Sequence, residues 1–520
     1  MKRSPILSAS EVLLLSVVAI GGGCNFGQSG IAPPANRIFL PAGLVADPDD
    51  GFLYVVNSNS DLRFNAGTVV AVDELTVNQA ADIRALATTQ PCTKTRFSRT
   101  EAVPDDYCCI DLVDSNIVNC NEPKFIQSNA TIQLGSFGGA VKLQRYQRDP
   151  KDPASEVVRR LFVAVRAEPS ITYADVTVDA TDPKAKKVSM RCTGLPRQNG
   201  PEQPINPFCD DNWRVRRPGG VTPGSLVLPE EPHELAYDKE LEALYVGHLT
   251  VTANAEVQGG GVSILDVCNP QSGSAVRFAG LARTTFLPAT LSQAVATLHT
   301  RDPAHPELAP DPIHPSTRLF ATARYTTAIS ALVLRSPDHA ACGDPERDDL
   351  TMVPAENFYS SVFFPHGMDI RGIILSDDGM RAYVLHRNDA ESPVSPAAVV
   401  VLDRRPGADG TPLNAPIDVL EVCGGPTAMQ MHDSGRGNRL YVTCYDDGEI
   451  YVVDPEAMVV TSVIEAGAGP ISLVFSPLDP GVAYVASFVN SHLSVIDLAP
   501  GSPTENHVVM RIGLPHGYGE

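Results

Sequence analysis

Catalytic signatures are what this chain most clearly lacks. Its 520 residues contain no G-x-S-x-G nucleophile elbow, no G-x-x-x-x-G-K-[ST] phosphate loop and no G-x-G-x-x-G dinucleotide fingerprint. The segment that begins at His233-Glu234 falls one residue short of H-E-x-x-H. The Asp-rich turns at 47–51 and 446–448 lack the glutamate that completes a calcium loop. The usual sequence evidence for a hydrolase, nucleotidase, dehydrogenase or zinc protease is therefore missing.

Charged residues and tryptophan are also scarce. Only 19% of the residues are charged, and Trp213 is the single tryptophan, whereas proline (44) and glycine (40) are plentiful. Few charges with many turn residues are typical of a loop-rich all-β protein. The formal net charge of -21 argues against a nucleic-acid partner, because phosphate backbones require a basic surface.

The eleven cysteines form no C-x-x-C pair, which leaves zinc ribbons, thioredoxin motifs and c-type haem attachment unsupported. Apart from Cys24, ten cysteines remain, and an even number in an exported chain favours disulfides over metal ligation. Proximity in the sequence predicts the pairs Cys192–Cys209 and Cys423–Cys444.

The N-terminus has the features of an export signal. A basic start, Met1-Lys2-Arg3, precedes an apolar run at 12–20 that is too short to span a bilayer. Gly21-Gly22-Gly23-Cys24 follows and resembles a lipobox, although Gly21 stands where that motif usually has leucine; an ordinary secretory signal is the alternative. We therefore expect residues 1–24 to be a lipoprotein signal peptide with Cys24 as the lipidated residue, and residues 25–36 to be a flexible tether. We then expect an exported, membrane-anchored lipoprotein that faces the periplasm or the cell surface. The outer membrane is favoured as the anchoring membrane.

One unit occurs twice in succession within residues 426–498. Each copy has an apolar run that starts at proline, an Asp/Gly/Pro turn, a run containing Tyr-Val, and a third run ending in aspartate. Tyr441 and Tyr484 lie 43 residues apart, and a period of roughly 40–50 residues of short β-runs is typical of propeller blades. One four-stranded sheet cannot bury both faces by itself, so the units must pack radially.

The repeat resembles the YVTN-type β-propeller family, since Tyr441-Val442-Thr443-Cys444 nearly spells that tetrapeptide and Tyr54-Val55-Val56-Asn57 approaches it. Seven units begin near residues 38, 140, 232, 293, 365, 426 and 470. The sequence thus predicts an all-β, seven-bladed β-propeller of four-stranded antiparallel blades over residues 37–520. Cysteine-bearing insertions are expected at about 75–127 and 180–221. Blades 2 and 4 depart most, with Val165 and Ala323 where the family motif ends in asparagine.

Two further regularities concern the strand ends. An aspartate closes the third strand in six units, where it can accept hydrogen bonds from the following turn; these residues are Asp73, Asp179, Asp266, Asp403, Asp454 and Asp497. Segments 37–40 and 508–512 both have the pattern of a fourth strand. We expect one of them to complete the last blade and close the ring, and the sequence leaves open which.

Histidines form the main candidate site. His233 and His366 start first strands directly after proline, while His248 and His386 end second strands, and these positions share one face of the disc. Imidazoles that converge on a central channel can bind zinc, copper or iron, or act as acid and base. We take His233, His248, His366 and His386 as candidate metal ligands, with no other cofactor expected; His516 repeats the Pro-His pattern at the chain end.

Two functions remain open at this level. The first is a cell-envelope lipoprotein that serves as a scaffold or binding module for a protein or glycan partner. We expect it to be a monomer that is anchored to the membrane through Cys24. The second is a metal-dependent hydrolase or lyase, or a lactonase-like enzyme, with His233, His366 and Glu234 at the channel mouth. Propellers support both classes, and the missing catalytic signatures favour the first.

Overall fold

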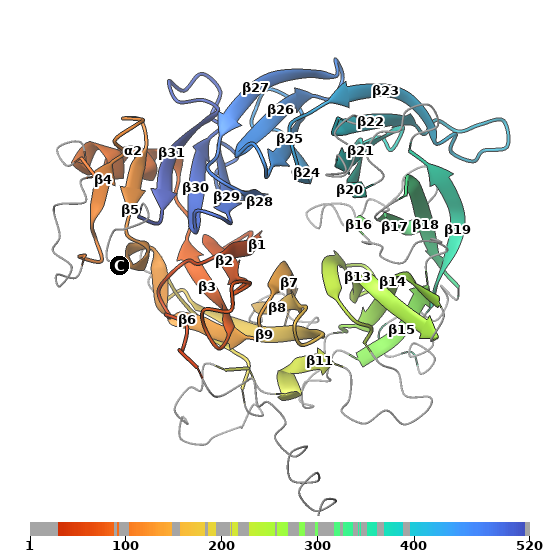
Figure 1. Cartoon of the computed structure of the whole chain (residues 1–520), viewed down its shortest axis with the longest axis horizontal. Helices are drawn as coiled ribbons and strands as arrows, with labels where there is room; N and C mark the ends of the chain where they lie inside the picture. Colours follow the sequence, from red (N-terminus) through yellow and green to blue (C-terminus); the bar gives the residue numbers. More distant parts are fainter. Residues whose placement is uncertain are drawn as a thin grey trace, which may run out of the picture.

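The computed structural model shows seven sheets arranged around a central axis (Figure 1), each with a blade of four antiparallel strands, which confirms the predicted seven-bladed β-propeller. We number the sheets as blades 1–7 in chain order. The structure describes residues 30–514 except for 88–90, 93–102, 148–156, 182–185, 194–207, 210, 217–227, 255–256, 269–279, 287–296, 300–316, 323–325, 336–341, 343, 345–350, 361–368 and 388–395.

In every blade the first strand lies nearest the axis and the following strands step outward. Blade 1 contains β1 (Pro41–Ala46), β2 (Phe52–Asn57), β3 (Gly67–Asp73) and β6 (Ile126–Leu134). Blade 2 contains β7 (Gly138–Gln147), β8 (Val157–Val165), β9 (Ser170–Asp179) and β10 (Lys187–Arg191). Blade 3 contains β12 (Pro232–Asp238), β13 (Ala243–Asn254), β14 (Val257–Asp266) and β15 (Gly280–Phe286).

The remaining blades repeat this order. Blade 4 contains β16 (Thr297–His299), β17 (Thr317–Thr322), β18 (Ala328–Leu334) and β19 (Met352–Tyr359). Blade 5 contains β20 (Asp369–Leu375), β21 (Arg381–Arg387), β22 (Ala398–Asp403) and β23 (Ala415–Glu421). Blade 6 contains β24 (Pro426–His432), β25 (Arg439–Cys444), β26 (Glu449–Asp454) and β27 (Val459–Glu465), and blade 7 contains β28 (Pro470–Phe475), β29 (Val482–Ser487), β30 (His492–Asp497) and β31 (His507–Ile512).

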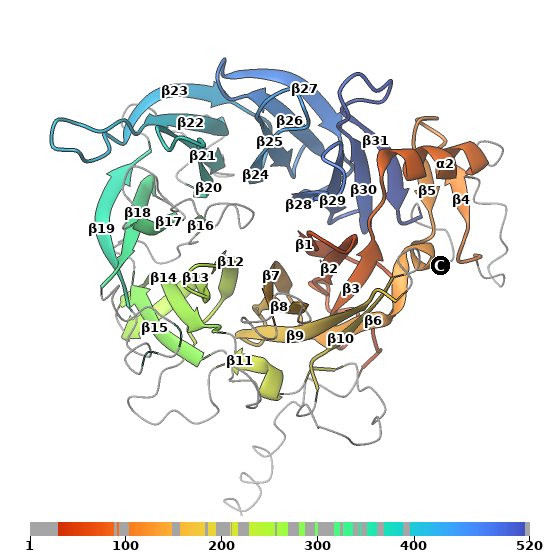
Figure 2. The same ribbon diagram turned by 180° about the vertical axis from the view of Figure 1, so that it is seen from behind.

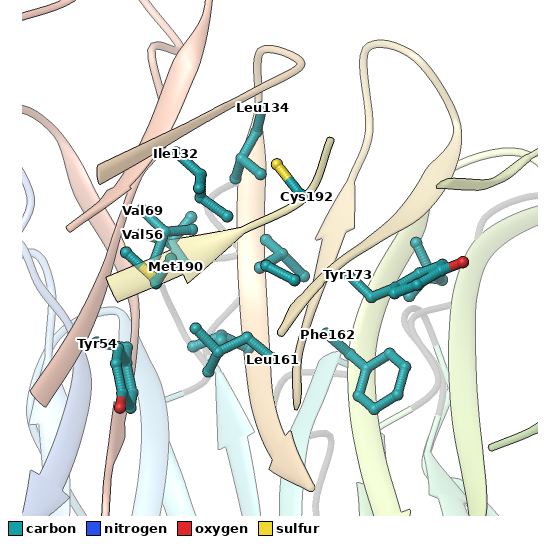
Figure 3. Close-up of a cluster of buried hydrophobic side chains, with 14 of the residues drawn as sticks. Tyr54, Val56, Val69, Ile132, Leu134, Leu161, Phe162, Tyr173, Met190 and Cys192 are labelled. Carbon is teal, nitrogen blue, oxygen red and sulfur yellow. The ribbon is translucent and has the colours of Figure 1, made fainter. Parts of the chain in front are cut away.

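The core lies between neighbouring blades. All six residues of β2, β29 and β30 are buried, because both faces of a middle strand pack against adjacent sheets. Figure 3 shows this packing between blades 1 and 2, where Val56 and Val69 meet Leu161 and Met190. By contrast, β27 and β23 consist mostly of exposed and half-buried residues, as expected for strands at the outer rim.

In several blades the tyrosine of the Tyr-Val motif links the blade to the next one. The hydroxyl of Tyr383 in blade 5 donates to the carbonyl of Pro455 in blade 6, at 3.3 Å. The hydroxyl of Tyr484 in blade 7 donates to the carbonyl of Leu75, just after the third strand of blade 1, at 3.1 Å. Because both acceptors follow the third strand of the next blade, the same contact that joins blades 5 and 6 also closes the ring between blades 7 and 1.

The C-terminal segment, not the N-terminal one, completes the last blade. Strand β31 pairs with β30, whereas residues 37–40 form no strand. Ring closure is reinforced by the insertion after β3, whose β5 (Val118–Cys120) pairs in parallel with β31 and whose β4 (Cys108–Ile110) extends the sheet further. The same insertion includes α2 (Val77–Ala87) and η1 (Glu122–Lys124), and Figure 2 shows β4, β5 and α2 at the rim beside β31.

Several predicted boundaries differ from the structure. The range 180–221, expected to be an insertion, includes the fourth strand β10 as well as η2 (Asp211–Trp213) and β11 (Arg214–Arg216), which pairs with β9. Strand β10 was overlooked because its alternating lysine, serine and arginine are exposed. The end of the expected tether, near Ile31 and Ala35, is hydrogen-bonded to blade 1 through Asn65 and Thr131.

Local sequence chemistry otherwise behaves as expected. Five of the six strand-closing aspartates accept a hydrogen bond from the backbone two residues on, at 2.9–3.0 Å, in blades 2, 3, 5, 6 and 7. The predicted disulfides Cys192–Cys209 and Cys423–Cys444 are present, together with Cys92–Cys109, Cys108–Cys120 and Cys268–Cys342. Within the described part of the chain, no helix has the length and apolar character needed to cross a membrane.

Candidate functional site

A cavity of about 470 Å³ lies on the propeller axis. Its described lining comes from six blades, all except blade 4, and uses the starts of first strands and the residues just after second strands. These two sets lie on one face because the strands are antiparallel, as shown by the pairing of Pro41 with Asn57 and of Pro232 with His248. The starts of first strands and the ends of second strands therefore share one face of the disc, as predicted.

Irregular backbone shapes the cavity wall. In blades 1, 3, 6 and 7 the first strand begins at a proline and is followed at once by a register shift, for example between Pro41 and Gly43. Proline fits there because it has no N–H to donate to a ladder. Strands β1 and β7 approach so closely that a Cβ atom on Gly43 would overlap the carbonyl oxygen of Gly139. Glycine at position 43 is thus required by the close approach of two inner strands.

His233 and Glu234 line the cavity, as predicted for the channel mouth. Nδ1 of His233 lies 3.4 Å from Oε1 of Glu234. Burial by itself would raise the pKa of Glu234, but His233, Lys142 and Arg371 outweigh it and hold the pKa below its usual value. Burial lowers the pKa of Lys142, an effect that the charge of Glu234 opposes. Glu234 is therefore ionised at neutral pH and is surrounded by cationic groups.

His248 is held in the wall of blade 3 as a structural residue. It is fully buried, and burial lowers the pKa of His248 to about 4. In the neutral ring, Nδ1 donates to the carbonyl of Glu230 at 3.1 Å, so Nε2 accepts from the hydroxyl of Ser263 at 2.8 Å. With both nitrogens engaged, His248 presents no free lone pair to a metal ion in this arrangement.

His386 occupies the equivalent place in blade 5, where Nε2 contacts the hydroxyl of Ser360 at 2.9 Å. Each histidine thus has a partner in the linker that arrives from the preceding blade, namely Glu230 for His248 and Ser360 for His386. The same tether recurs at the end of other second strands: Asn57 donates to the carbonyl of Arg37, Ser487 donates to the carbonyl of Ala466, and Cys444 is bonded to Cys423. The last position of the Tyr-Val motif therefore anchors the incoming linker, and histidine is one way to do so.

The structure does not bring the four histidines together as one described site. His366, together with His516 and the lipidation candidate Cys24, lies outside the described residues. His248 and His386 are used by separate blades, and His233 faces the cavity. Among the described residues, the one group with metal-ligand spacing is Glu242, Cys268 and Cys342, but these two cysteines form a disulfide. Metal binding by His233 and His366 stays a prediction.

Sequence reasoning missed the cationic and aromatic parts of the cavity. Lys142, Arg166, Arg371 and Arg387 line it, together with Phe137, Tyr445 and Phe488. A weak sequence signal existed for two of them, because Lys142 directly follows the apolar start of β7 and Arg371 precedes the apolar end of β20. Arg166, Tyr445 and Phe488 directly follow second strands in blades 2, 6 and 7, and nothing in the sequence marks these loops as convergent.

Comparison with known proteins gives only distant likenesses. No protein-family model and no curated protein matches the chain. Among solved structures it is similar to Kuenenia stuttgartiensis hydrazine synthase, at 12% identity over 92% of this chain and 99% of that one, with a TM-score of 0.42. It is also similar to PpgL, the periplasmic gluconolactonase of Pseudomonas aeruginosa, at 15% identity over 70% and 85% of the two chains, with a TM-score of 0.41. Likenesses this distant carry no argument about ligand or reaction.

Proposed function

We propose that the protein is a lipid-anchored binding module of the cell envelope whose channel mouth holds a glycan. The observation that carries this proposal is the cavity on the axis, which gathers side chains from six blades into about 470 Å³. A volume of this order is typical of small-molecule sites, and it suits a few sugar units better than a protein partner, which would need a much larger contact surface.

Aromatic side chains support the choice of a glycan. Tyr445 and Phe488 lie side by side at the mouth, with ring centroids 6.4 Å apart and planes inclined by 47°. Gly469 has a positive φ of 68° beneath them, and a Cβ there would lie 3.0 Å from the Tyr445 ring. Such rings offer flat apolar faces to the C–H side of a sugar, while Gln430, Thr427 and Ser472 add polar groups.

The binding test uses the soluble protein that starts after Cys24. Calorimetric titration with a panel of oligosaccharides should reveal at least one ligand, with no product formed. Replacing Phe488 or Tyr445 by alanine should weaken binding about tenfold. Tyr359→Ala, a change of an exposed aromatic residue on the outer strand β19, is the matched control and should leave affinity unchanged. Failure of every saccharide to bind, or equal affinity in all variants, would contradict the proposal.

The anchoring part of the proposal has its own test. Lipidation at Cys24 predicts incorporation of labelled palmitate and recovery of the full chain in the membrane fraction. Cys24→Ser should abolish the label and release the protein. Recovery of an unlabelled, soluble wild-type protein would show an ordinary secretory signal instead.

A lactonase-like or other hydrolytic activity is the second candidate. It is favoured by one observation, namely that His233 and Glu234 lie 3.4 Å apart at the wall of the same cavity. Turnover of a sugar lactone by the soluble protein, abolished by Glu234→Gln with binding retained, would replace the binding module by an enzyme.

A further inference from the structure

The described wall of the channel mouth is cationic in a protein that is otherwise acidic. Lys142, Arg166, Arg371 and Arg387 line the cavity, and Glu234 is the one carboxylate among the described lining residues. The chain as a whole has a formal charge of -21. Four basic side chains from blades 2 and 5 that face one cavity thus oppose the general charge of the molecule.

These charges are close enough to act on one another. Lys142 extends from β7 and Arg371 from β20, and both help to hold the pKa of Glu234 below its usual value against the effect of burial. The Lys142 side chain is exposed to solvent, but the surrounding protein atoms disfavour its charged form and lower its pKa. An anionic group that entered the cavity would relieve this penalty, because an opposite charge favours the protonated lysine.

Acidic groups just outside the lining compensate the arginines only in part. Arg371 pairs with Asp369 at 2.7 Å. The contacts of Arg387 with Asp446, at 3.8 Å, and of Arg166 with Glu231, at 3.5 Å, are longer than ordinary hydrogen bonds and involve half-exposed carboxylates. Such pairs contribute little, so Arg387 can turn its planar donors to a carboxylate in the cavity without losing a strong partner.

We propose that the channel mouth recognises the carboxylate of an acidic saccharide through Arg387 and Lys142, an inference that rests on the proposed function of the cavity as a glycan site. Arg387 presents paired N–H donors to the carboxylate, and Lys142 supplies a second positive charge. Glu234, held ionised, accepts hydrogen bonds from sugar hydroxyls. Tyr445 and Phe488 contact the ring, so charge and ring stacking together define the ligand class.

The test compares galacturonate oligosaccharides with neutral galactose oligosaccharides of equal length, and with inorganic phosphate and citrate, by calorimetry on the soluble protein. The acidic oligosaccharide should bind at least tenfold more tightly than the neutral one, and less tightly at high salt. Arg387→Gln and Lys142→Gln should each weaken it roughly tenfold. Arg387→Lys, which keeps the charge but loses the paired donors, should give an intermediate affinity. Arg405→Gln, at an arginine whose side chain is 69% exposed and paired with Asp403, is the control and should have no effect.

The outcomes separate this inference from the function on which it rests. Equal binding of acidic and neutral saccharides, weakened only by the Tyr445 and Phe488 variants, would overturn carboxylate recognition and leave the glycan site standing. Phosphate or citrate that binds as tightly as the acidic saccharide would show a simple anion site and overturn the saccharide class. Binding of no saccharide at all would overturn both proposals.

Discussion

Six of the seven blades fall into two kinds, which differ in the aromatic residue of the second strand. Blades 1, 3, 5 and 7 have tyrosine in the second strand with a hydroxyl that takes part in the joint to the next blade, whereas blades 2 and 4 have Phe162 and Phe320 there. Where the hydroxyl is absent, another group makes the link. Gln144 donates to the carbonyl of Val267 in blade 3 at 2.8 Å, and the guanidinium of Arg404 in blade 5 lies 5.1 Å from the centre of the Phe320 ring.

The tyrosine joints themselves are of two types. In blades 5 and 7 the hydroxyl bonds directly to a carbonyl of the next blade. In blade 3 the hydroxyl of Tyr245 donates to Asp238 at 3.0 Å, and Asp238 pairs with Arg318 of blade 4 at 2.8 Å. Blade 1 repeats this with Tyr54, Asp47 and Arg159. The comparison teaches that the position of the joint is constant while its chemistry varies. The loss of stability caused by each substitution below should therefore depend on the type of joint.

The largest effect is expected at the ionic joint between blades 3 and 4. Arg318→Met leaves the carboxylate of Asp238, which is 4% exposed, without its cation, and should reduce the free energy of unfolding by about 3–5 kcal/mol. Chemical denaturation measures the loss. Arg381→Met is the matched control, since its pair with Glu456 is far more exposed and should contribute at most about 1 kcal/mol. Equal losses in the two variants would show that burial does not distinguish these joints.

The joint between blades 7 and 1 should depend on pH through Glu74, which accepts a hydrogen bond from Ser476. Burial raises the pKa of Glu74 from 4.5 to about 7 in the folded protein. Between these values the folded state binds a proton that the unfolded state has lost, so this group makes stability fall as the pH rises from about 4.5 to about 7, by about 3 kcal/mol.

Denaturation curves for the wild type and Glu74→Gln over this pH range measure that contribution. The variant should lack the decrease, because its amide does not titrate. A wild type and variant with parallel pH profiles would assign the dependence to other groups.

A somewhat smaller loss is expected for Tyr484→Phe. Its buried hydroxyl both accepts from the amide of Leu75 and donates to the carbonyl of the same residue. Phenylalanine keeps the ring but leaves two buried backbone groups unpaired, which should cost about 2–3 kcal/mol. Thermal unfolding and hydrogen exchange near Leu75 would detect it, and unchanged protection at that amide would contradict the role of the hydroxyl in ring closure.

The smallest effect is expected for Tyr383→Phe. This hydroxyl makes a longer bond, 3.3 Å to Pro455, so the loss should be about 0.5–1 kcal/mol. The ratio of the two Tyr→Phe effects is the sharpest measure of the comparison, because the chemical change is identical. A larger loss at Tyr383 than at Tyr484 would reverse the order proposed for the two joints.

Much of the fold could be predicted because its signals are local. The alternating apolar runs, the Asp-rich turns and the prolines that start first strands each act within a few residues. Seven blades and the hydrogen bonds of five strand-closing aspartates therefore follow from local sequence. The candidate site could be predicted in part. His233 and Glu234 were placed at the channel mouth, but Lys142, Arg371 and Arg387 were not, because their convergence depends on inner strands from different blades.

The histidine hypothesis shows why the rest could not be derived. His248 and His386 were placed correctly on the face where second strands end. Sequence position does not reveal the direction of a side chain, and both turn to the linker from the preceding blade. Only a comparison with Asn57, Ser487 and Cys444, which occupy the same place, identifies them as tethers.

The sequence by itself determined the class of fold, the number of blades and two of the disulfides, since each depends on patterns within one blade or between near neighbours. Tertiary structure alone decided how the ring closes and what lines its axis. Strand β5 joins β31 across almost four hundred residues of chain, and the cationic cavity gathers residues from blades that share no local signal. Such contacts depend on how whole sheets pack around the axis, which no short segment encodes.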